Sequence, residues 1–115
     1  MKNRKEYGFW GERKAERYLK RHHYRILARN YTTPVGEIDL IAADGDVLVF
    51  IEVKTRSSTA FGLPCEAVTL QKQHKIVQVA QCYLMQNPTQ SPCRFDVVEI
   101  LPEGLRLLKD AFRIG

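Results

Sequence analysis

The sequence predicts an α/β fold: a central mixed sheet flanked by helices, in a single domain spanning residues 1–115. Two stretches, near residues 5–22 and 69–86, repeat apolar residues at helical spacing. Short strand-like runs surround them, and two of these runs flank the tight-turn signal Asp44-Gly45-Asp46. A tight hairpin is antiparallel, whereas a helix between two strands favours a parallel crossover, so we expect both orientations in one sheet.

Composition and charge are typical of a globular protein that acts on a polyanion. No apolar run is long enough to span a membrane and no signal-peptide pattern is present, so we expect a cytoplasmic protein. Three cysteines without paired spacing predict reduced thiols. Residues 1–30 carry ten Lys or Arg and three Glu, a net charge of +7, whereas the remainder carries −2. This asymmetry suits nucleic acid; a solvated basic helix face is the alternative.

The first helix, predicted over residues 5–22, has small residues on one face. Gly8 and Gly11 each cost about 1 kcal/mol relative to alanine in a helix interior, so close packing against another element is the expected compensation. Glu12 borders these small residues and is either a solvated helix residue or a carboxylate directed at the hairpin. Basic residues fill much of the remaining surface and would face solvent or phosphate: Arg13, Lys14, Arg17, Lys20 and Arg21.

The hairpin follows a strand predicted over Tyr24 to Tyr31 and a turn around Pro34. Its turn decides which charged side chains meet. A two-residue turn at Gly45-Asp46 would place Asp39 opposite Glu52, and Glu37 opposite Lys54. A turn at Asp44-Gly45 would shift the register by two and keep these side chains on one face, whereas a three-residue loop would separate them.

Three carboxylates and one lysine on largely apolar strands predict a cation site. Charges are seldom buried without a partner or a metal. The excess negative charge would be neutralised by Mg²⁺ or Mn²⁺, which prefer hard oxygen ligands. The alternative is a surface hairpin with cross-strand ion pairs, each contributing little to stability. Spacing alone leaves both open.

The second half of the chain predicts a loop, a helix and two strands. In the loop from Thr55 to Pro64, Arg56 is either a phosphate ligand or a surface arginine. A helix over residues 69–86 begins at Thr69 as N-cap, with Lys72 in its first turn. Strands are expected at residues 93–100 and, after a turn, at 105–108.

This order and these motifs resemble the PD-(D/E)XK, or restriction-endonuclease-like, nuclease superfamily. Asp39 followed by Glu52-Val53-Lys54 matches its pattern, with Ile38 in place of the proline. More specific segments resemble the YraN family of small bacterial proteins. They are Gly8-x-x-Gly11-Glu12-x-x-Ala15-x-x-Tyr18-Leu19, Asn30-Tyr31, Gly36-Glu37-Ile38-Asp39-Leu40-Ile41, Phe50-Ile51-Glu52-Val53-Lys54-Thr55-Arg56, Phe61-Gly62-x-Pro64, Lys72-Gln73 and Arg94-Phe95-Asp96-Val97. One departure is His23-Tyr24, where a Gly-Tyr pair is usual.

The resemblance implies a Mg²⁺-dependent DNA endonuclease, with Mn²⁺ as a substitute, acting on branched or repair and recombination DNA. Archaeal Holliday-junction resolvases in the same superfamily are similar in size and in an N-terminal helix glutamate. A branched substrate cut twice would require a homodimer. The alternative is a non-catalytic nucleic-acid-binding module that keeps the fold.

The resemblance also implies roles for individual residues. Asp39 and Glu52 would hold the metal, with the carbonyl of Val53 as a third ligand. Lys54 would orient or help deprotonate the attacking water and stabilise the phosphorane charge. Glu37 or Glu12 would complete a second metal site or support the first. Arg56 and Lys72 would bind the phosphodiester, and Arg13, Lys14 and Arg17 would extend the nucleic-acid surface.

Overall fold

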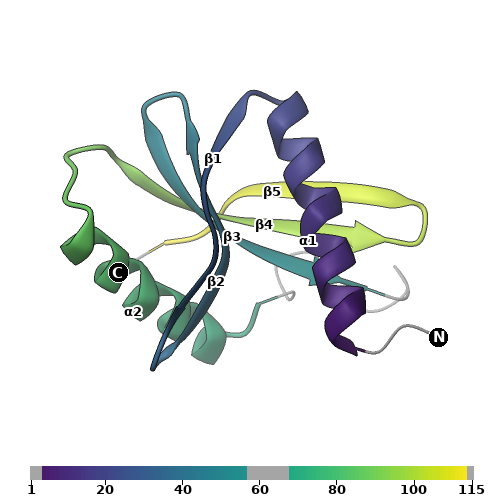
Figure 1. The fold of residues 1–115 in the computed structure, drawn as a ribbon, viewed down its shortest axis with the longest axis horizontal. Coiled ribbons are helices and arrows are strands. Elements are labelled where there is room, and N and C mark those ends of the chain that lie inside the picture. The colour runs from purple at the N-terminus through teal and green to yellow at the C-terminus, as the bar shows by residue number, and fades with distance from the viewer. Residues whose placement is uncertain (1–3, 57–67, 114–115) are drawn as a thin grey trace.

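A computed structural model of the chain describes residues 4–56 and 68–113, with side chains from Trp10 onward. Within these residues the chain forms two helices and five strands, whose arrangement Figure 1 shows. They are α1 (Arg4–Arg21), β1 (Tyr24–Thr33), β2 (Gly36–Asp44), β3 (Val47–Thr55), α2 (Leu70–Gln86), β4 (Cys93–Leu101) and β5 (Gly104–Phe112).

The five strands form one mixed sheet in the order β1-β2-β3-β4-β5. Neighbouring strands are antiparallel except β3 and β4, which are parallel and are joined through α2. The predicted hairpin and parallel crossover are therefore confirmed.

The last strand is longer than the predicted residues 105–108. The consecutive charged residues Lys109 and Asp110 follow Leu108, and Asp110 has a φ of 55°, so the sequence underestimates the length of the strand.

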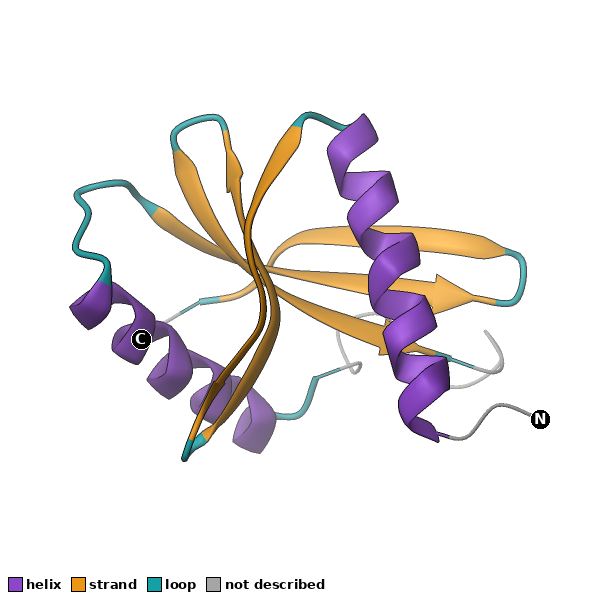
Figure 2. Cartoon of the chain, in the orientation of Figure 1, coloured by secondary structure: helices purple, strands orange, loops and turns teal. Residues whose placement is uncertain are grey.

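The two helices cover opposite faces of the sheet (Figure 2). On one face Ala15 and Leu19 of α1 pack with Leu40, Ile51 and Val98. On the other face α2 packs against a cluster that includes the stacked rings of Phe50 and Phe95. This arrangement agrees with the restriction-endonuclease-like architecture that the resemblance implied.

Gly11 brings α1 close to the end of β3. A Cβ atom at Gly11 would lie 2.6 Å from Oγ1 of Thr55, closer than side chains normally approach. The close packing predicted for the small residues of this helix is therefore present at Gly11; the surroundings of Gly8 lie outside the described side chains. This contact fixes Glu12, the next residue, above the hairpin.

The end of α1 has a backbone conformation that favours glycine at position 23. His23 has a φ of 70°, in the left-handed region, and its amide donates a hydrogen bond to the carbonyl of Lys20. Helices commonly end on such a residue, and glycine adopts this conformation without a Cβ penalty.

Replacing His23 with glycine should therefore stabilise the protein. We expect His23→Gly to raise the free energy of unfolding by about 1 kcal/mol, because the left-handed conformation costs other residues roughly that much. Urea unfolding followed by circular dichroism measures the change. His22→Gly is the matched control, and it should destabilise or leave the protein unchanged; a gain in both variants would contradict the explanation.

Several predictions concern segments outside the described residues. The loop expected up to Pro64 falls, from residue 57, in the gap between residues 56 and 68, as does Cys65. Cys82 and Cys93 are free thiols, as predicted. Neither described helix is long and apolar enough to cross a membrane.

Candidate functional site

The turn of the β2–β3 hairpin is Gly45-Asp46. Gly45 has a φ of 59°, and the ladder runs from the pair Asp44 and Val47 to the pair Leu40 and Ile51. Asp39 and Glu52 are therefore the next residues on the two strands. Of the registers that the sequence left open, this is the one that places these two carboxylates across from each other.

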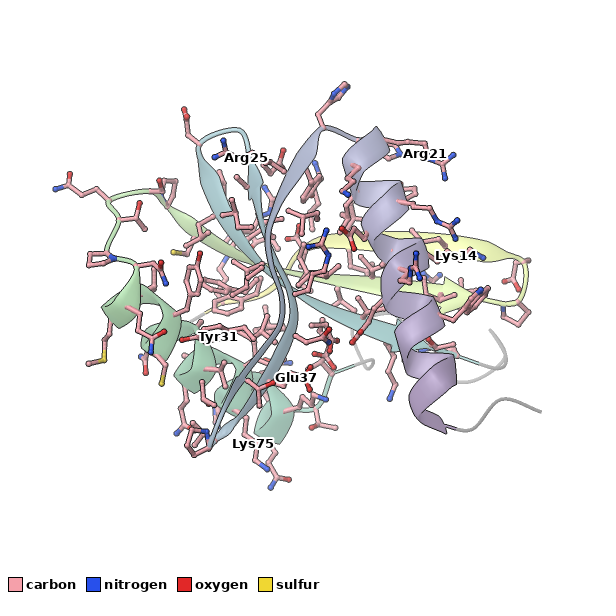
Figure 3. All side chains as sticks on the ribbon, in the orientation of Figure 1. Lys14, Arg21, Arg25, Tyr31, Glu37 and Lys75 are labelled. Carbon is pink, nitrogen blue, oxygen red and sulfur yellow. The ribbon has the colours of Figure 1, made fainter. Side chains whose placement is uncertain are left out.

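Three carboxylates meet where β2 leaves β3 and passes under α1. Glu12 of α1 and Glu37 and Asp39 of β2 each offer an oxygen, and these three oxygens lie within 4.8 Å of one another. Figure 3 labels Glu37 on its strand. We call this set the acidic cluster. Glu12 is therefore directed at the hairpin, which was one of its two sequence interpretations.

Asn30 holds two members of the acidic cluster together. Its side-chain amide donates to both oxygens of Glu12, at 3.1 and 3.0 Å, and to Oε1 of Glu37 at 2.9 Å. Asn30 has a φ of 49°, and the β1–β2 ladder pairs its neighbours Arg29 and Tyr31 but not Asn30 itself. This local break lets the consecutive side chains of Arg29 and Asn30 both face α1.

Sequence reasoning did not assign a role to Asn30. A signal was present, because asparagine enters the left-handed region more readily than most residues. Asn30 also belongs to one of the segments that resemble the YraN family. What the sequence lacked was any indication that the first strand would be irregular at this position.

Within the acidic cluster, the carboxyl of Asp39 has a pKa that its surroundings raise strongly. Burial, followed by the negative charges of Glu52 and Glu12, raises the pKa of its carboxyl to about 9. A hydrogen bond from the Val53 amide to Oδ2, at 2.8 Å, opposes this rise. Asp39 is therefore protonated at neutral pH unless a cation compensates the surrounding charge.

Glu52 lies beside the acidic cluster but makes its ion pair with α2. It is only 7% exposed, and its Oε1 is 3.0 Å from Nζ of Lys72. Burial disfavours the charge on Lys72, but the hydrogen bond and charge of Glu52 outweigh it, so the pKa of this lysine is raised. Lys72 thus forms an ion pair with Glu52, a carboxylate that was predicted to hold metal. Lys54 is exposed near the end of β3.

Arg56 forms an ion pair beneath the site. Its Nε is 2.5 Å from Oε2 of Glu99, which is fully buried on β4, and NH2 of Arg106 is 3.0 Å from the other oxygen. The two sequence interpretations of Arg56 were a phosphate ligand and a surface arginine. The structure gives it a partly buried contact with Glu99, and the phosphate role stays a prediction.

Arg56→Ala should therefore act mainly on stability. Removing one partner of a buried ion pair typically costs 3–5 kcal/mol; because Arg106 still contacts Glu99, we expect a loss of about 2 kcal/mol. Chemical unfolding measures it. The exposed Arg17→Ala is the control and should change stability little. An Arg56→Ala protein of unchanged stability that binds nucleic acid more weakly would show that the phosphate role is the main one.

A groove of about 700 Å³ runs between α1 and β1 beside the acidic cluster. We call it the α1–β1 groove; its walls include Trp10, Glu12, Arg13 and Arg17 of the helix and Arg29 and Asn30 of the strand. Glu12 thus belongs to both the groove and the acidic cluster, and Asn30 lines the groove while bonding to the cluster. Within the groove, Arg29 binds Glu16 through a bidentate contact, and this contact lowers the pKa of the Glu16 carboxyl.

The predicted basic residues of α1 are distributed around this groove. Arg13 and Arg17 line it and are exposed. Lys14 extends over the ring of Trp10, with its Nζ 5.1 Å from the ring centroid. Figure 3 shows Lys14 and Arg21 projecting from α1. The predicted basic surface and the predicted acidic patch therefore adjoin.

Comparison with known proteins identifies one family. The model of "Uncharacterised protein family UPF0102" matches residues 11–100. A UPF0102 protein of Lachnoclostridium phytofermentans is 48% identical over 112 residues, covering 96% of this chain and 95% of that protein. A UPF0102 protein of Clostridioides difficile is 46% identical over 113 residues, covering 96% and 99%. The matched region contains every member of the acidic cluster.

Proposed function

This chain belongs to UPF0102, the YraN family, and we propose that it is a metal-dependent nuclease that hydrolyses phosphodiester bonds of DNA. One observation carries the proposal: the acidic cluster joins a partly buried carboxyl of raised pKa to two further carboxylates, one of which lines a basic groove. The proposed substrates are branched or repair and recombination DNA.

The residues present fit a Mg²⁺ ion, with Mn²⁺ as a substitute. Glu12, Glu37 and Asp39 offer the hard oxygens that these ions prefer, and Glu52 lies beside them. The raised pKa of Asp39 reflects uncompensated negative charge at a buried position, which a divalent cation would relieve. When bound, such an ion neutralises phosphate charge and lowers the pKa of water in its coordination sphere.

The groups around the acidic cluster have different proposed roles: some orient the carboxylates, and others contact the phosphodiester. Asn30 orients Glu12 and Glu37 through its amide, and the Val53 amide orients Asp39. The exposed ammonium of Lys54 would reach a phosphodiester at the cluster, position the attacking water and stabilise negative charge on the phosphorane. Lys72 holds Glu52 in place through their ion pair.

The same Lys72 contact favours a second candidate function. A lysine already neutralises Glu52, which reduces the negative charge available for a cation. In a non-catalytic nucleic-acid-binding module, the acidic cluster and this ion pair would stabilise the fold, and the α1–β1 groove alone would hold the ligand.

A cleavage assay separates the two functions. Labelled four-way junction, flap, single-stranded and duplex DNA are incubated with Mg²⁺, Mn²⁺ or EDTA. We expect metal-dependent cutting by the wild type, lost in Asp39→Ala and Lys54→Ala and retained in Glu103→Gln, which changes an exposed acid in the β4–β5 turn. Salt-sensitive binding without cutting, unchanged in both site variants, would contradict the nuclease and support the binding module.

A further inference from the structure

We propose that the α1–β1 groove binds a single-stranded segment of nucleic acid, with one base stacked on Trp10 and the adjoining phosphates on Arg13 and Arg17. This inference rests on the proposed function, because it makes the groove the path by which a strand reaches the acidic cluster. It adds a substrate class and a stacking residue that the nuclease proposal does not contain.

Trp10 is the first reason. It is 38% exposed on a strongly basic helix and lines the groove two residues before Glu12. A large, partly exposed ring beside a phosphate-binding surface is the arrangement with which proteins bind unpaired bases, since every base has a face that stacks. The ring therefore offers a contact that a basic surface alone lacks.

One contact of the ring, the one with Lys14, can be displaced. The Lys14 ammonium lies 5.1 Å from the Trp10 centroid, and such a cation–π contact at an exposed site contributes about 0.5–1 kcal/mol. Stacking of a base on an aromatic side chain contributes about 1–3 kcal/mol. Stacking is thus the stronger interaction, and the displaced ammonium can then contact a phosphate of the same strand.

A single strand suits this site better than a duplex. The faces of paired bases are covered by their neighbours within a double helix, so Trp10 would find no base face along a closed duplex. The groove lies between a helix and a strand; the strand wall carries Asn30 and Arg29, and Arg29 bonds across to Glu16 on α1. A strand with unpaired bases can place its backbone on α1 while one base turns to the ring.

The charges of the groove predict a shallow salt dependence. Glu16 already neutralises Arg29 and lies 3.2 Å from Nζ of Lys20. We assign the phosphate contacts to Arg13, Arg17 and Lys14, which exchange their present contacts for the strand. Three phosphate contacts on a single strand correspond to a slope of about −2 in log affinity against log salt.

Fluorescence tests the inference directly, because Trp10 is the only tryptophan in the chain. Oligo-dT, oligo-U and a relaxed, covalently closed circular duplex are titrated into wild type in EDTA and into Asp39→Asn in Mg²⁺. We expect both single strands to quench Trp10 and to bind at least about tenfold more tightly than the closed duplex. If only oligo-dT or only oligo-U quenches, the ligand is DNA or RNA, respectively.

Variants test the two contacts separately. Binding followed by anisotropy of a labelled oligo-dT should weaken about 5- to 150-fold in Trp10→Ala, the equivalent of the stacking free energy. Arg17→Gln should weaken binding several-fold and make the salt slope shallower, whereas Arg25→Gln, an exposed arginine near the other end of β1, should change neither.

Equal quenching by closed duplex, strand binding without quenching, or no strand binding in either condition would each overturn the inference. The outcome is distinguishable from failure of the nuclease proposal. Metal-dependent cutting with unchanged Trp10 fluorescence would reject the groove assignment alone, whereas Trp10 quenching without cutting would reject the nuclease and leave the groove assignment intact.

Discussion

Without divalent cations, Asp39→Asn is expected to raise the melting temperature, and the gain should increase as pH rises from about 4 to 9. The folded protein holds a proton on Asp39 up to a pKa of about 9, whereas the unfolded chain releases it near pH 4. Across this window the folded state binds more protons, so wild-type stability falls with rising pH, by up to about 1.4 kcal/mol per pH unit. Because asparagine does not ionise, the Asp39→Asn protein should not lose stability in this way as pH rises.

Differential scanning calorimetry at several pH values in EDTA measures the effect. Near pH 4 the two proteins should melt together, and near pH 8 the variant should melt at least about 5 °C higher, since 1 kcal/mol shifts a domain of this size by several degrees. Added Mg²⁺ should stabilise wild type and leave the variant unchanged. A lower melting temperature in Asp39→Asn at pH 8 would contradict an uncompensated charge at this position.

The second large effect is expected from substitutions of Asn30, which should lower the rate of metal-dependent cleavage. Asn30→Gly and Asn30→Ala both remove the amide that joins Glu12 to Glu37, and we expect each to lower metal-dependent cleavage about 10- to 100-fold, as is usual for groups that orient metal ligands. The two variants differ in the backbone, because glycine tolerates a φ of 49° and alanine does not.

Only Asn30→Ala should therefore lose stability, by about 1 kcal/mol relative to Asn30→Gly. Measuring cleavage and urea unfolding on both variants separates the two roles of the residue. If Asn30→Gly cleaved DNA as fast as wild type while Asn30→Ala did not, the amide would have no positioning role, and the backbone conformation alone would matter.

The features predicted well from the sequence depend on local signals. The helices follow from apolar periodicity and the Thr69 cap, whose hydroxyl accepts from the Lys72 amide. The hairpin itself follows from its tight-turn signal, but the sequence left open which turn forms, and the turn at Gly45-Asp46 is what places Asp39 across from Glu52.

The features that the sequence did not predict depend on neighbours distant in the chain. The contact of Arg56 with Glu99 exists because β3 and β4 lie side by side in a parallel register, which no local signal specifies. The pairing of Lys72 with Glu52 likewise depends on how α2 lies across the sheet. The break at Asn30 depends on α1 above it, since its amide bonds to Glu12.

The most direct test of the central claim is Mn²⁺ binding, measured by electron paramagnetic resonance of free Mn²⁺ during titration. The claim is that Glu12, Glu37 and Asp39 hold a divalent cation. We expect wild type and Glu103→Gln to bind Mn²⁺ with the same affinity, and Asp39→Asn and Glu37→Gln to bind at least about tenfold more weakly. Equal binding by all four proteins would place any cation elsewhere and contradict the claim.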